Sequence, residues 1–140
     1  MNIVIKSIPT KEQRYATLGD YWTDQDGTLQ FRVSSEFCKK GQVLLLLHEM
    51  VEAFLCQNDG ISFLSIDEFD KAFEKRADKP PESEPGDDPA CPYRLQHRRA
   101  ENIERLMADS MRVEWPRYVA EFDEIVKALD ALSRSGHFDK

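Results

Sequence analysis

The chain has 140 residues, of which 41% are apolar and 32% are charged, a balance typical of one globular domain rather than a disordered chain. Its formal net charge of −7 excludes a nucleic-acid binder that relies on a basic surface, because phosphate neutralisation needs clustered lysine and arginine. The longest apolar run, residues 43–47, is far shorter than the roughly 20 residues of a membrane-spanning helix, so no membrane association is expected.

The first third of the chain predicts β-strands. Residues 2–8 (NIVIKSI) form a β-branched run, and Asp26-Gly27 separates two segments rich in aromatic and β-branched residues, a pattern that favours a hairpin. The N-terminus lacks the basic and apolar regions of a signal peptide, and the three cysteines are widely spaced without a CxxC pair. We therefore expect a small antiparallel sheet in a reduced, cytoplasmic protein.

Two helices are expected next. The apolar segment that follows the strands runs to about Gln57, with Ser34-Ser35-Glu36 suited to cap its start and Asn58-Asp59-Gly60 suited to end it. A second helix is expected from Ser65, because Ser65 and Glu68 have the spacing of a capping box.

Residues 79–92 predict a loop, since they hold five of the seven prolines and four acidic residues. A loop of this length in a small domain is commonly functional or disordered, and Asp87 and Asp88 would either fold over a site or stay in solvent. A third helix is expected at about 93–113, and a fourth after Trp115-Pro116, because proline suits the first helical turn. The expected fold class is α+β: a small antiparallel sheet followed by about four helices in a single domain, residues 1–140.

The most apolar helical segment, VLLLLHEMVEAFLC at 43–56, contains three ionisable residues near its centre. His48 and Glu52 are four residues apart and lie on one face of a helix, whereas Glu49 lies one step round it. Burying a polar group without a partner costs about 2–7 kcal/mol, so these side chains need solvent, an ion pair or a metal ion. Hydrogen bonding of His48 within the core beside a solvated glutamate stripe is the simpler interpretation.

The third helix carries a matching set. His97 and Glu101 are again four residues apart, and Glu104 follows one turn later at the border of the apolar face. If the two helices meet, His48, Glu52 and His97 supply two imidazoles and one carboxylate, an accepted ligand set for catalytic zinc. Glu101 or Glu104 would then be a fourth ligand or orient a histidine.

The segment HEMVEA resembles the active-site helix of zincin metallohydrolases, in which HExxH supplies two zinc ligands and a catalytic glutamate. The resemblance extends to the later His/Glu helix and the preceding small sheet. Compared with the gluzincin branch, Glu52 occupies the position of the second histidine and His97 that of the late glutamate. The resemblance implies Zn²⁺, a zinc-bound water activated by Glu49 as general base, and an amide in a peptide or protein as the target. The small, acidic chain also resembles phage and prophage proteins.

Two other functions fit parts of the sequence. Glu49-x-x-Glu52 and Glu101-x-x-Glu104 have the spacing by which all-helical nucleotide pyrophosphohydrolases hold Mg²⁺, and oxygen ligands also suit Mn²⁺. The hairpin and the two histidines favour zinc over this alternative. The third possibility is a non-enzymatic protein whose acidic surface binds a basic partner.

Overall fold

The computed structural model describes residues 1–81 and 83–139 and has the α+β architecture expected from the sequence. None of the helices in these residues is long and apolar enough to cross a membrane. The strands are β1 (Ile3–Ile8), β2 (Gly19–Thr23) and β3 (Leu29–Ser34). The helices are α1 (Lys39–Asn58), α2 (Phe63–Glu74), α3 (Arg94–Ser110) and α4 (Trp115–Arg134), with 3-10 turns η1 (Thr10–Glu12) and η2 (Pro85–Asp87).

The sheet is mixed, with the strand order β1-β3-β2. β2 and β3 form the predicted antiparallel hairpin, and Gly27 in its turn has a φ of +86°, which glycine adopts without strain. β1 pairs with β3 in parallel, which corrects the expectation of an antiparallel sheet throughout. The chain passes from β1 to the far edge strand β2 before the hairpin returns β3 to the centre, a crossover that strand composition does not encode.

The start of α1 differs from the predicted one. Ser34 belongs to β3, and the helix begins at Lys39, after Cys38, whose sulfur accepts the N–H of Gly41. Of the residues expected to cap this helix, Ser34 ends β3, and Ser35 and Glu36 form the turn that follows it.

The start of α2, by contrast, is earlier than predicted. The hydroxyl oxygen of Ser62 accepts the N–H of Ser65, which lies inside the helix. The expected capping box of Ser65 and Glu68 is therefore wrong, because the serine three residues upstream caps the helix instead.

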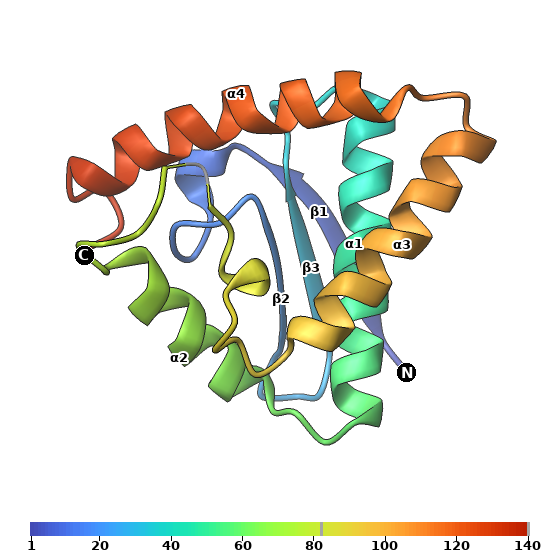
Figure 1. The fold of residues 1–140 in the computed structure, drawn as a ribbon. Coiled ribbons are helices and arrows are strands. Elements are labelled where there is room, and N and C mark those ends of the chain that lie inside the picture. The colour runs from blue at the N-terminus through green and yellow to red at the C-terminus, as the bar shows by residue number, and fades with distance from the viewer. Residues whose placement is uncertain (82, 140) are drawn as a thin grey trace.

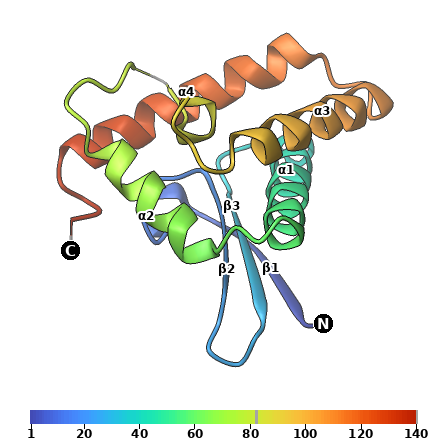
Figure 2. The same ribbon diagram turned by 60° about the horizontal axis from the view of Figure 1, so that its bottom comes forward.

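α1 packs against β2, β3 and α3, and Figures 1 and 2 show α1 and α3 side by side in both views. α4 extends from the end of the molecule near these two helices to the side on which α2 lies. The segment around η2 passes between α2 and α3 (Figure 1). Phe31, Leu44 and Cys56 are among the largest fully buried side chains in the core around α1. α1, α3 and the η2 segment thus converge on one region.

Candidate metal centre

Three buried side chains on α1 and α3, here called the His48 cluster (His48, Glu52 and His97), direct one donor atom each toward a common point. His48 Nε2 lies 3.1 Å from Glu52 Oε2 and 3.2 Å from His97 Nδ1. His97 Nδ1 lies 2.9 Å from the same oxygen of Glu52. The four-residue spacing places His48 and Glu52 on the buried face of α1, and the packing of α3 brings His97 to them. These are the three ligands predicted from the sequence.

The second ring nitrogen of His48 is held from α3 and α4. Its Nδ1 lies 2.9 Å from Glu104 Oε1, and the hydroxyl of Tyr118 donates to Glu104 Oε2 at 2.5 Å. Since a carboxylate only accepts, Nδ1 carries the hydrogen in this contact and the neutral ring has its lone pair on Nε2. The side chain that orients His48 is therefore Glu104.

The second polar atoms of Glu52 and His97 also have partners. The hydroxyl of Tyr21 donates to Glu52 Oε1 at 2.7 Å, and His97 Nε2 lies 3.5 Å from Asp87 Oδ1. A Cβ atom on Gly86 would clash with the ring of His97, so glycine is required where η2 meets this histidine. The η2 segment thus contacts the site through Asp87, while Asp88 pairs with Arg76 instead.

Burial and hydrogen bonding act in opposite directions on the pKa values of this cluster. Burial lowers the pKa of His97, but Asp87 and Glu52 outweigh it and raise that pKa to about 10. Burial raises the pKa of Glu52, yet the hydrogen bonds from both histidines lower it to about 2. Burial likewise opposes protonation of His48, but Glu104 and Glu52 raise its pKa well above 6.5. Protons and a metal ion therefore compete for the same donor atoms.

Glu49 and Glu101 lie beside the cluster rather than in it. Both line an adjoining cavity of about 220 Å³. Glu49 is 9% exposed and has no hydrogen bond to any residue in the described part of the chain, and burial, followed by the charge of Glu52, raises its pKa well above 4.5. A Cβ atom on Gly19 would lie 2.5 Å from Glu49 Oε1, so β2 approaches this carboxylate closely.

Sequence reasoning missed several residues of the site. Tyr21 and Tyr118 bond the two buried glutamates from β2 and α4, but a single tyrosine in an apolar pattern indicates only core. Glu84 lines the cavity from the 79–92 loop, and burial raises its pKa to about 7. Its only signal was its place in a long loop that precedes the His97 helix. Glu82 of this loop lies outside the described residues.

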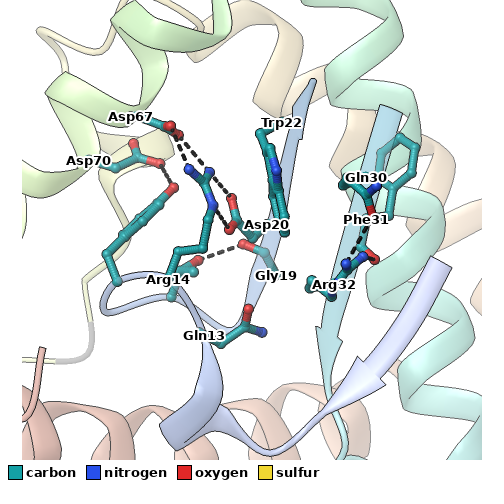
Figure 3. Close-up of polar contacts among 12 residues, drawn as sticks. Gln13, Arg14, Gly19, Asp20, Trp22, Gln30, Phe31, Arg32, Asp67 and Asp70 are labelled. Carbon is teal, nitrogen blue, oxygen red and sulfur yellow. Dashed lines mark hydrogen bonds and ion pairs between the residues drawn. The ribbon is translucent and has the colours of Figure 1, made fainter. Parts of the chain in front are cut away.

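A second set of charges, the Arg14 cluster (Arg14, Asp20 and Asp67), joins β2 to α2 around the buried carboxylate of Asp20 (Figure 3). Arg14 donates to both oxygens of Asp20 at 2.8 and 2.9 Å, and to both oxygens of Asp67 at 3.1 and 3.3 Å. Its guanidinium also lies 4.2 Å from the centre of the Trp22 ring. These contacts hold the segment before β2 that forms one wall of the cavity.

Comparisons with protein-family models, with curated proteins and with solved structures found no match to this chain. The function proposed below therefore depends on the geometry and chemistry of the site.

Proposed function

We propose that this protein binds a divalent metal ion, with zinc favoured, through His48 Nε2, Glu52 Oε2 and His97 Nδ1, and uses it to hydrolyse an amide or peptide bond. The convergence of these three atoms, each on a side chain whose other polar atom is already held, carries the proposal. Zinc ligands at about 2.0–2.1 Å in a tetrahedral shell stand about 3.3–3.4 Å apart, so the observed separations need to open by only a few tenths of an ångström.

The arrangement suits catalysis as well as binding. Three protein ligands leave a fourth position for water, and a bound zinc ion supplies a water whose pKa falls toward 7. Glu49 has a carboxylate free of hydrogen bonds to the described residues and faces the cavity, so it is the group to accept a proton from such a water. The cavity itself gives the substrate access to this position.

The magnesium alternative receives less support. Both oxygens of Glu104 are engaged, one by His48 and one by Tyr118, and Glu101 is not part of the donor cluster. Two imidazole nitrogens suit zinc better than magnesium, which prefers oxygen ligands. An acidic interaction surface, the third possibility, gives no reason for buried donor atoms to converge.

Elemental analysis and zinc titration of the purified protein test the proposal. The wild type should take up about one zinc ion per chain, with an affinity that rises with pH because the ligands must lose protons. His97→Ala removes a ligand itself. It should weaken zinc binding by more than the 10–100-fold expected when only the hydrogen-bond partner of a ligand is removed. His137→Ala is the matched control, because His137 contacts the Lys11 carbonyl away from the cluster. Failure of the wild type to bind zinc, cobalt or manganese, or equal zinc affinity in His97→Ala, would overturn the proposal.

A further inference from the structure

The cavity beside the His48 cluster is strongly acidic. Of the described residues that line it, Lys79 is the one lysine, and none is an arginine. Among the described residues, ten carboxylates line the cavity, many more than a metal site requires. They are Asp20, Glu49, Glu52, Asp70, Glu74, Glu84, Glu101, Glu104, Asp123 and Asp130.

Six of these carboxylates have protein partners. Arg14 bonds Asp20, Lys79 bonds Glu74 and Asp130, and tyrosines or histidines bond the other three. The remaining four have no hydrogen bond or ion pair to any residue in the ranges 1–81 and 83–139. They are Glu49, Glu84, Glu101 and Asp123.

Glu49 and Glu84 have different relations to the proposed chemistry. Glu49 is more than nine-tenths buried, lines the cavity and has no hydrogen-bond partner among the described residues. In the proposed function it is the base that accepts a proton from the water. Glu84 is partly buried on the η2 side, and donor atoms of Glu84, Asp87 and His97 all lie within 4.8 Å of one another. A cationic group bound to Glu84 would therefore lie next to the proposed metal ligands.

The cavity also has apolar lining between its carboxylates. From α4 alone, Phe122, Val126 and Leu129 line it next to Asp123 and Asp130. An apolar lining beside free carboxylates fits a ligand with an aliphatic part and a cationic end, whereas an anionic ligand such as a nucleotide would be repelled.

We propose that the cavity selects substrates that carry a cationic nitrogen, as ammonium or guanidinium, and that Glu84 is the carboxylate that binds it. This inference rests on the proposed function, because it names the substrate class of that same site. Glu84 acts here in binding and specificity, and Glu49 remains the base.

Binding of small probes to the zinc-loaded protein, followed by NMR, tests the inference. The probes are propylguanidinium and butyramide, which is neutral and of similar size. Guanidinium has no lone pair to offer a metal, so its binding reports the carboxylates alone. We expect propylguanidinium to bind about 10–100-fold more tightly than butyramide, the range for a hydrogen bond to a charged group, and to weaken as salt is added.

Glu84→Gln should abolish this preference, and Glu84→Asp, which keeps the charge, should retain part of it. Glu68→Gln is the matched control, since Glu68 is exposed on α2 and lies outside the cavity lining. Equal binding of both probes to the wild type, or an unchanged preference in folded Glu84→Gln, would overturn the inference.

The zinc content of every sample is measured before the probes are added. A wild type that binds none of zinc, cobalt and manganese refutes the proposed function at that step, whereas a zinc-loaded protein without cation preference refutes only the inference. Alanine amide and Nα-acetyl-lysine amide then distinguish an α-ammonium from a side-chain ammonium. Tighter binding of either than of neutral N-acetyl-alanine amide supports the inference, and no difference from it contradicts the inference.

Discussion

The Arg14 cluster and the His48 cluster both bury carboxylates, but they balance the charge differently. The side chain of Asp20 is 1% exposed, and the guanidinium of Arg14 donates to both of its oxygens. In the His48 cluster, one oxygen of Glu52 faces two ring nitrogens that also face each other at 3.2 Å. The carboxylate of Asp20 is satisfied within the protein by a cation, whereas the converging donor atoms of the His48 cluster can share either protons or a bound metal ion.

The largest effect expected is on catalysis, from variants that distinguish the proposed base, Glu49, from the proposed ligand, Glu52. Glu49→Gln should keep zinc and the fold but lose about 10²–10⁴ in the rate of peptide hydrolysis, because the amide cannot accept a proton as a carboxylate does. Glu52→Gln should instead lose zinc. Zinc content and single-turnover hydrolysis of a cationic peptide would be measured on both variants. The reverse pattern would favour a carboxylate-held magnesium site.

Breaking the Arg14 cluster should affect stability and leave the metal site intact. Arg14→Met strands the Asp20 carboxylate without a cation, which should lower the free energy of unfolding by about 3 kcal/mol. Urea denaturation measures this loss, and zinc titration should show an unchanged affinity. Arg32→Met is the control, because Arg32 also stacks on Trp22 but donates only to Phe31 O and Gln30 Oε1. A tenfold loss of zinc affinity in folded Arg14→Met would show that the two clusters are coupled.

The sequence predicted those parts of the site that follow from local helical geometry. The four-residue spacing alone places His48 and Glu52 on one face of α1. His97 was predicted because the same spacing recurs at the border of an apolar face. Neither prediction needed knowledge of how the chain folds back on itself.

The partners that orient the ligands depend on tertiary contacts, which local patterns do not contain. Tyr21 reaches Glu52 across 31 positions of the chain, and Glu104 reaches His48 across 56. The parallel pairing of β1 was missed for the same reason, since it depends on where the hairpin inserts. The caps of α1 and α2 were misplaced in opposite directions, Cys38 after and Ser62 before the predicted residues, because several neighbouring polar residues can each cap a helix start.

A smaller effect on zinc affinity is expected from changing Glu104, the hydrogen-bond partner of His48 Nδ1. Glu104→Gln should weaken zinc binding about 10–100-fold, because the carboxylate fixes the tautomer that leaves the lone pair on Nε2. Competition with a chromogenic chelator measures this affinity. Tyr118→Phe removes one hydrogen bond to Glu104 and should weaken zinc binding less. Full affinity in Glu104→Gln would mean that packing alone orients His48.

Asp70 differs from Asp20, because among the described residues this buried carboxylate has only hydroxyl donors, from Tyr15 and Tyr93. Burial raises its pKa from 3.8 to about 8, so the folded state holds a proton that the unfolded state loses. The contribution of Asp70 to the free energy of unfolding is therefore fully present below pH 3.8. It falls as the pH rises from there and is lost once the pH has passed about 8. Asp70→Asn cannot ionise, so its free energy of unfolding should rise relative to the wild type by up to about 1.4 kcal/mol per pH unit in that window. Denaturation of both proteins between pH 5 and 9 measures the difference, with the exposed Asp109→Asn as control. A difference that does not change with pH would mean that Asp70 is ionised throughout, held like Asp20 by partners that compensate its charge.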